Sequence, residues 1–360
     1  MKLLHGGDIY SYKEKKDAGL LVDFSANISP LGMPEKVRQA ILDELEDALH
    51  YPDPCYRRLR AAIAEKISGD YGILQAADGI ICGNGAADVI YRLVLALRPR
   101  TALLCAPTFA EYEEALRLCK AKLKIYALPP DTLTVEDEIL DALTPEVDMM
   151  FLCNPNNPTG LLISQTLMRR IIEKTRSTGI FLVVDECFLD FSGEEKKRSV
   201  LPELSQNKHI LVLKSFTKMY AIPGVRLGYG VCRDMELVEA MGHAGQAWPV
   251  STLAESAGIA ALSCDEYKAA VCDYVENERR YLFEQLESMG IRYWRSCANY
   301  ILMRIPKEYH AFEQLEERGL IIRRCANYRN LDDSFYRIAV NRHEDNMRLV
   351  NELQKIMNTL

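Results

Sequence analysis

The chain has 360 residues, of which 48% are hydrophobic and 26% are charged, and its formal net charge is −7. This composition is typical of a globular protein that is long enough for two domains. The acidic balance argues against non-specific binding of nucleic acid.

The spacing of the eleven cysteines and the absence of a long apolar run further restrict the kinds of protein that this chain can be. No C-x-x-C pair occurs, so a metal site is not predicted, and buried free thiols in a reducing compartment are favoured. No apolar run reaches the ~18 residues of a membrane span, and no signal-peptide pattern opens the chain. We therefore expect a cytoplasmic protein without a membrane contact.

The first part of the chain is predicted to be an irregular arm over residues 1–33, followed by two helices. Pro34 is suited to the first turn of a helix, and apolar residues recur at four-residue spacing up to Leu45. The segment Tyr51-Pro52-Asp53-Pro54 ends this helix. A second helix is expected over about residues 56–68.

From residue 79 short apolar strands alternate with helices, which predicts a doubly wound, mostly parallel sheet. The expected strands are Gly79–Cys82, Thr101–Cys105, Leu123–Ala127, Asp148–Cys153, Ile180–Asp185, Ile210–Lys214 and Leu227–Cys232. The expected helices between them are Ala87–Leu97, Ala110–Lys120 and Ser164–Ser177. This sheet belongs to a large domain that is expected over residues 34–250.

Beyond about residue 250 the pattern predicts a smaller α/β domain over residues 251–360. Its expected helices are Thr252–Ser263, Tyr267–Met289, 308–318 and 343–357, and its expected strands are Tyr300–Ile305, Leu320–Arg324 and Tyr336–Val340.

Polar groups follow the predicted strands at several points. A glycine turn at Gly83-Asn84-Gly85 precedes a helix, whose first N–H groups suit an anion. A plain βα turn and a dinucleotide fingerprint are alternatives, but Asp88 replaces the third glycine of that fingerprint. Asp185 ends a buried strand and needs a partner, which is a helix cap, a buried ion pair or a cationic ligand. Arg337 lies inside a strand, where a planar anion or a structural ion pair is expected.

The richest segment follows the strand at residues 210–214. Two hydroxyls and two cations, Ser215, Thr217, Lys218 and Arg226, lie within twelve residues of one another. Ligands of open α/β sheets bind outside the carboxyl ends of the strands. An anion site with an amine beside it is therefore predicted here, with a solvated loop as the alternative.

Two strings carry a resemblance to a known family. Ser215-x-x-Lys218 is followed by Pro-Gly-x-Arg-Leu-Gly, and Asn154-Pro155-Asn156-Asn157-Pro158-Thr159-Gly160 forms a rigid turn. Both resemble the fold-type I pyridoxal-phosphate (PLP) enzymes, the aspartate-aminotransferase superfamily. The resemblance implies an α/β fold, in which a large domain has a mostly parallel seven-stranded sheet and a smaller C-terminal α/β domain follows.

The resemblance also implies roles for single residues. Lys218 is the Schiff-base lysine, and Asp185 pairs with the pyridinium nitrogen of the cofactor, so that both are catalytic. The other implied cofactor contacts are Gly85, Ala86 and Ala87 at the phosphate, Phe109 on the ring, Asn157 at the 3′ oxygen, Ser215, Thr217 and Arg226 at the phosphate, and Tyr51 from a neighbouring subunit. A C2 homodimer with shared active sites is thus expected.

Within the superfamily two families compete, histidinol-phosphate aminotransferase and the L-threonine-O-3-phosphate decarboxylase of the cobalamin pathway. The segments 5–8, 23–32 and 322–332 look like the decarboxylase, although Asp8 stands where its motif often has Asn. Phe188 also resembles the decarboxylase, since many aminotransferases of the superfamily have a Tyr at this position. The implied substrate is a small phosphorylated amino acid. Its implied contacts are Asn157, Arg337 for the carboxylate, and His5 and Arg323 for the distal phosphate.

Two other classes are weaker alternatives. A dinucleotide-dependent oxidoreductase rests on the glycine turn alone. A non-catalytic regulator with the PLP fold needs a DNA-binding segment, and the sequence has no basic stretch to supply one.

Overall fold

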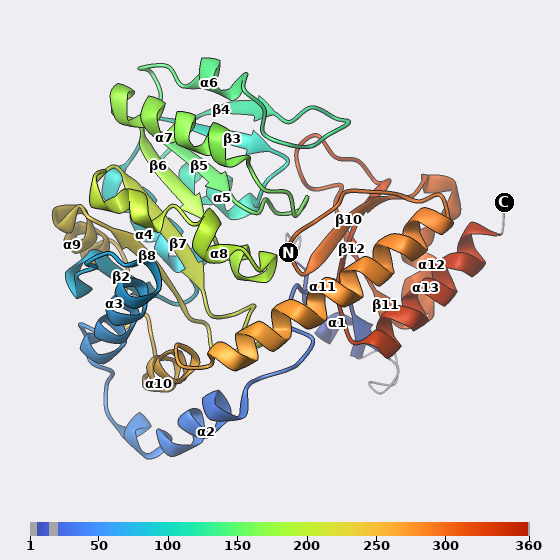
Figure 1. Ribbon diagram of the computed structural model, residues 1–360, viewed down its shortest axis with the longest axis horizontal. Helices are drawn as coiled ribbons and strands as arrows, with labels where there is room; N and C mark the ends of the chain where they lie inside the picture. The colour runs from blue at the N-terminus through green and yellow to red at the C-terminus, as the bar shows by residue number, and fades with distance from the viewer. Residues whose placement is uncertain (1–5, 14–20, 359–360) are drawn as a thin grey trace.

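The computed structural model describes residues 6–13 and 21–358. Its centre is a seven-stranded sheet in the order β2-β8-β7-β6-β5-β3-β4 (Figure 1). The strands are β2 (Ile80–Gly83), β3 (Thr101–Ala106), β4 (Lys122–Ala127), β5 (Met149–Cys153), β6 (Phe181–Asp185), β7 (Ile210–Ser215) and β8 (Gly228–Cys232). β8 runs opposite to the other six strands of this sheet. The predicted mostly parallel sheet is confirmed.

Helices cover both faces of this sheet because its central strands are apolar on both sides. Leu182 and Val184 of β6 pack in one core with α3 (Arg57–Tyr71) and α7 (Gln165–Thr178). Val183 faces the other core, which includes α4 (Ala86–Leu97), α5 (Ala110–Leu118) and α9 (Met235–His243). Alternate residues of one strand thus pack against the helices on opposite faces of the sheet.

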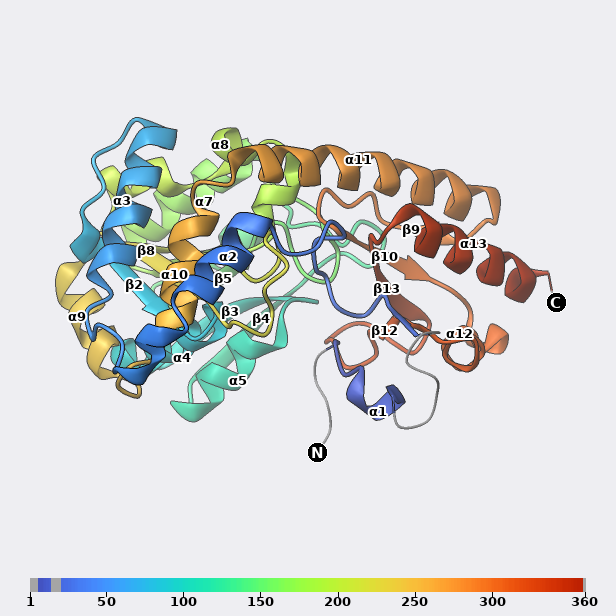
Figure 2. The same ribbon diagram turned by 90° about the horizontal axis from the view of Figure 1, so that it is seen from below.

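A second, smaller sheet has four antiparallel strands in the order β12-β13-β10-β9 (Figure 2). Its strands are β9 (Arg292–Tyr293), β10 (Tyr300–Arg304), β12 (Arg323–Arg324) and β13 (Phe335–Ala339). Its core includes residues of α11 (Asp265–Ser288), α12 (Ala311–Glu317) and α13 (His343–Met357). This smaller sheet carries Arg337.

Two of the differences from the expected elements concern the strand at residues 320–324 and the first helix. The strand expected over residues 320–324 is two short strands, because Leu320–Ile321 (β11) pairs with Val22–Asp23 (β1) and Arg323–Arg324 pairs with β13. The first long helix, α2 (Glu35–Asp43), ends earlier than expected, and a 3₁₀ turn follows at Glu46–Leu49.

The helix α10 (Thr252–Ala261) places Ala254 and Ala257 in the same core as Leu59 of α3. The short helices α1 (Tyr10–Lys13), α6 (Ile139–Ala142) and α8 (Glu195–Arg198) complete the described α-helices. No described helix is long and apolar enough to cross a membrane.

Candidate active site

A cavity of about 460 Å³ lies where the carboxyl ends of β5, β6 and β7 approach the smaller sheet. Most of the predicted site residues line it: Gly85, Ala86, Ala87, Phe109, Asn157, Asp185, Ser215, Thr217, Lys218, Arg226 and Arg337. These residues come from segments as much as 250 positions apart. The fold therefore brings the separate sequence motifs to one place.

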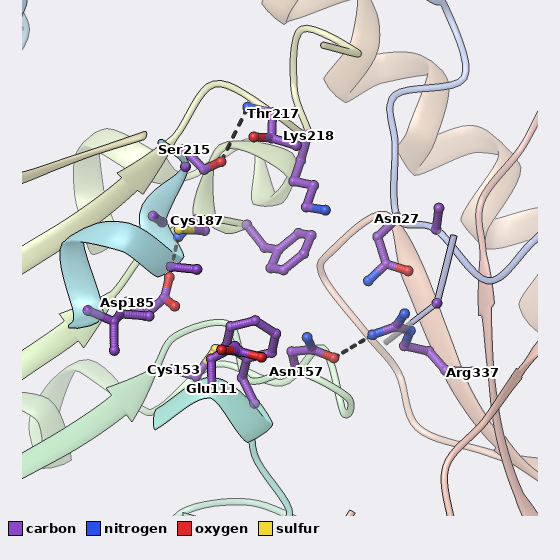
Figure 3. A pocket seen from close by; sticks show the side chains of 18 of the residues that line it. Asn27, Glu111, Cys153, Asn157, Asp185, Cys187, Ser215, Thr217, Lys218 and Arg337 are labelled. Carbon is purple, nitrogen blue, oxygen red and sulfur yellow. Dashed lines mark hydrogen bonds between the residues drawn. The ribbon is translucent and has the colours of Figure 1, made fainter. Parts of the chain in front are cut away.

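Lys218 reaches into this cavity from the segment after β7 (Figure 3). Burial, together with the cations of Arg337 and Arg226, lowers the pKa of its amine to about 8. A large fraction of this amine is therefore neutral near pH 8. A neutral amine is the form that attacks a carbonyl carbon.

The turn before α4 and the guanidinium of Arg226 form a cradle. Gly85 has φ +83°, and a Cβ there would lie 2.7 Å from Nη2 of Arg226. A Cβ on Gly228 would lie 2.3 Å from the backbone nitrogen of Ala86, so both positions require glycine. The cradle combines a helix N-terminus with a cation and the nearby hydroxyls of Ser215 and Thr217, which suits a phosphate group.

Asp185 is fixed at the end of β6 by two donors. The hydroxyl of Tyr112 donates to its Oδ2 at 2.6 Å, and the backbone N–H of Cys187 donates to its Oδ1 at 2.9 Å. Burial raises the pKa of Tyr112 well above its usual value, so this hydroxyl stays protonated as a donor. Each carboxylate oxygen still has a lone pair for a cationic ring N–H.

Asn157 and Arg337 meet across the boundary between the two sheets. Nη1 of Arg337 donates to Oδ1 of Asn157 at 2.6 Å (Figure 3). The hydroxyl of Tyr328 donates to the same oxygen at 3.2 Å. Since both donors hold Oδ1, the amide Nδ2 of Asn157 is left to donate elsewhere.

Arg337 is 5% exposed, and its Nη2 donates to the carbonyl oxygen of Ser25 at 2.8 Å. Its buried Nε has no hydrogen-bond partner, and no carboxylate within the described part of the chain forms an ion pair with it. The structural ion pair that the sequence left open is therefore not seen among these residues.

Two predicted site residues of the described chain do not line the cavity, and a third lies outside the described residues. Arg323 is the register partner of Arg337 on the neighbouring strand, and its Nη2 donates to Oδ1 of Asn327 at 3.0 Å. Tyr51 is 80% exposed and stacks on Trp248 with ring centroids 4.6 Å apart. His5 lies outside the described residues, although its neighbour Gly6 lines the cavity.

Several cavity residues were not assigned from the sequence. Asn27 is 3% exposed, lines the cavity, and has an Oδ1 without a hydrogen-bond partner in the described chain. Tyr328, Cys187 and Glu111 also line it. Asn27 and Tyr328 lie inside strings that suggested the decarboxylase family, but a string does not say which of its side chains turn inward.

Comparison with known proteins assigns the chain to a family. The family model for aminotransferase class I and II matches residues 20–353. The chain belongs to the class I and II aminotransferase family. Enzymes of this family use PLP, and the predicted fold class is confirmed by similar solved structures. The dinucleotide alternative for the glycine turn is thereby set aside.

Three relatives illustrate the range of this family. The threonine-phosphate decarboxylase of Salmonella typhimurium is 37% identical over 94% of this chain and 91% of its own length. The histidinol-phosphate aminotransferase of Methanosphaera stadtmanae is 29% identical over 94% of this chain and 90% of its own length. The structure of the histidinol-phosphate aminotransferase from Clostridium acetobutylicum superposes with a TM-score of 0.87 at 28% identity, covering 94% of this chain and all of that one.

The residues present fit the family's cofactor. The Gly85 cradle suits its phosphate, Asp185 suits its ring nitrogen, the free Nδ2 of Asn157 suits its ring oxygen, and the amine of Lys218 suits its aldehyde. Phe109, which is predicted to lie on the cofactor ring, also lines the cavity.

Proposed function

We propose that this chain is a PLP-dependent decarboxylase that converts L-threonine O-3-phosphate into (R)-1-aminopropan-2-ol O-phosphate and CO₂ in cobalamin biosynthesis. The observation that carries the proposal is the buried guanidinium of Arg337, which lines the cavity with an unsatisfied Nε. A buried cation of this kind requires an anionic partner, and a substrate carboxylate fits its planar fork. The similarity to the Salmonella enzyme supports the choice of substrate.

Each residue then has a chemical task. PLP, when bound, supplies the electron sink that takes up the electron pair from the breaking bond at the substrate Cα. Arg337 holds the substrate carboxylate, and Asp185, oriented by Tyr112, keeps a proton on the ring nitrogen. Lys218 is placed to give a proton to Cα after CO₂ has left, since its pKa of about 8 suits proton transfer near neutrality.

The distal phosphate of the substrate needs a second cationic site. We assign it to His5 and Arg323, with the amide of Asn27 as a further contact. Support comes from Gly6 and Asn27, which line the cavity, and from Arg323, which is the register partner of Arg337. The cofactor phosphate is assigned separately to Arg226 and the Gly85 cradle.

Histidinol-phosphate aminotransferase is the second candidate. It is favoured by the similarity to the Methanosphaera and Clostridium proteins. Phe188 argues for the decarboxylase, because it packs edge-on against Tyr300 with ring centroids 5.0 Å apart and has no hydroxyl for the ring oxygen. Asn157 is then the donor that we assign to that oxygen.

A direct assay decides between these two reactions. We expect CO₂ from L-threonine O-3-phosphate without an amino acceptor, and much slower turnover of unphosphorylated threonine, because losing a charged hydrogen bond costs roughly 1.5–3 kcal/mol. Turnover of L-histidinol phosphate with 2-oxoglutarate, without CO₂ from the first substrate, would establish the aminotransferase instead. Borohydride reduction tests the lysine: a Lys218→Ala variant in which reduction still links PLP covalently to the chain contradicts its assignment.

We further propose a C2 homodimer in which Tyr51 completes the neighbour's site. The support is that Tyr51 does not line its own cavity and lies in an exposed apolar region. This region, here called the α2 surface, consists of Leu42, Leu45, Leu49, Tyr51 and Trp248, whose exposed fractions range from 42% to 87%. A second copy of the chain would cover it.

A further inference from the structure

A second, much smaller cavity of about 50 Å³ lies behind the wall of the candidate active site. Ser215 lines both cavities, so the two spaces share one strand end. Besides Lys66 and Asp70, the charged residues that line the smaller cavity are these four: Lys214, Glu195, Asp190 and Lys268. None of these four residues lines the larger cavity.

These side chains form one continuous ion network around Glu195. The ammonium group of Lys214 donates to Oε1 of Glu195 at 2.7 Å and lies 3.1 Å from Oε2 of Glu186. The ammonium group of Lys268 donates to Oδ1 of Asp190 at 2.8 Å and to Oε2 of Glu195. Each oxygen of Glu195 thus accepts from one lysine, and the hydroxyl of Tyr71 also donates to Oε1 at 3.1 Å.

The network contains one more carboxylate than ammonium groups, and it is mostly screened from water. The side chains of Lys214 and Glu186 are 5% and 0% exposed, and that of Glu195 is 16% exposed. The two lysines hold the pKa of Glu195 well below its usual value. Glu195→Gln would leave two carboxylates facing the two ammonium groups, so its effect would come from the lost link between the two lysines and not from an unpaired charge.

The members of the network belong to elements that build the site. Glu186 follows Asp185 in sequence, and Lys214 precedes Ser215 at the end of β7. Lys268 lies near the start of α11, which lies beside α8 in both views (Figure 1, Figure 2). Glu195 is the first residue of α8.

The helix α11 reaches from this network to the smaller sheet. Its first turns are also held to the arm, since the hydroxyl of Tyr267 donates to the carbonyl oxygen of Gly32 at 2.5 Å. Its later residues Val275, Leu282 and Leu286 pack in the core of the smaller sheet. The sheet that carries Arg337 is thus attached to a helix whose start is anchored beside β7.

We propose that Glu195 is a positioning residue of the cofactor site, because it ties the Lys214–Ser215 strand end to the start of α11. In this role Glu195 fixes the position of Ser215, and of the segment after it that carries Lys218, relative to the smaller sheet. It touches neither substrate nor cofactor, and it acts through Lys214 and Lys268. The inference rests on the proposed PLP site.

The test measures the dissociation constant of PLP from its absorbance on titration into apoprotein, at a temperature where circular dichroism shows every variant folded. We expect Glu195→Gln to weaken PLP binding roughly 10- to 100-fold, by analogy with the loss found when a residue that orients a metal ligand is removed. Lys268→Met, which leaves the Lys214–Glu195 contact in place, should show a smaller loss in the same direction. The double variant should be no worse than Glu195→Gln, because both changes break one network.

Glu194→Gln is the matched control. It removes the charge of the adjacent residue, whose Oε2 accepts from Nε of Arg198 at 3.1 Å in a partly exposed pair outside the network. PLP binding by this variant should equal that of the wild type. A lower melting temperature for Glu195→Gln with unchanged PLP affinity would overturn the proposal, as would additive losses in the double variant. If the wild-type chain binds no PLP, the cofactor assignment fails instead.

Discussion

At the residue scale, the amine of Lys218 offers a test that needs neither cofactor nor substrate. Burial and two neighbouring cations lower its pKa to about 8, whereas an unperturbed lysine titrates near 10.4. Only the neutral amine reacts with an aldehyde, so its labelling by formaldehyde and cyanoborohydride in apoprotein should rise through about pH 8. Peptide mass spectrometry measures the labelled fraction, and Lys218→Met supplies the background. A rise only above pH 10 would contradict the buried, cation-flanked site.

Arg337 should affect both the pKa of the Lys218 amine and the binding of the substrate. Its positive charge contributes to the lowered pKa of Lys218, so Arg337→Leu should move the labelling midpoint upward from about pH 8. In the loaded enzyme the same change should raise KM for the carboxylate substrate by about 10- to 150-fold, since a charged hydrogen bond contributes roughly 1.5–3 kcal/mol.

Arg324→Leu is the control for this change. Arg324 lies on β12, pairs with Glu313 and is half exposed, so its loss should alter neither quantity. An unchanged midpoint in Arg337→Leu would mean that the two side chains do not share one cavity.

At the scale of an element, the turn between β2 and α4 depends on the conformation of Gly85. Because its φ is +83° and an added Cβ would lie 2.7 Å from Nη2 of Arg226, Gly85→Ala should cost ~1–2 kcal/mol of stability and displace the guanidinium. We therefore expect PLP affinity to fall by roughly tenfold or more. Gly224→Ala, where a Cβ meets nothing within 4 Å, should bind PLP normally. Equal affinities in the two variants would remove Arg226 from the cradle.

The elements also show what the sequence could and could not predict. The central strands were predictable because apolar runs such as residues 181–184 identify strands covered on both faces. The break between β11 and β12 was not, because it is made by pairing with β1, a segment almost 300 residues earlier. Pairing partners of two-residue strands leave no periodic pattern.

The site shows the same division. Motif residues such as Lys218 and Asp185 follow or end strands directly, so their convergence at one sheet edge could be predicted. Tyr112 could not be assigned, because its contact with Asp185 depends on how α5 packs on the sheet. The network around Glu195 was also missed, since its members are ordinary charged residues in sequence and become connected only through the packing of α8 and α11.

At the scale of the whole molecule, the α2 surface leads to a prediction about assembly. Leu49 is 87% exposed at the end of a 3₁₀ turn, and Tyr51 follows it in a stacked pair with Trp248. If this surface binds its copy in a C2 dimer, Leu49→Asp should bury two carboxylates at the interface and drive the protein toward monomer. Analytical ultracentrifugation over a range of concentrations measures this shift.

Activity should follow assembly in the same samples, because each cavity would lose the neighbour's Tyr51. Leu118→Asp is the matched control, since Leu118 is 61% exposed at the end of α5, away from the α2 surface. It should remain a fully active dimer. A wild-type chain that sediments as a monomer at full activity would contradict the shared site, and Tyr51 would then be a surface aromatic that stacks on Trp248.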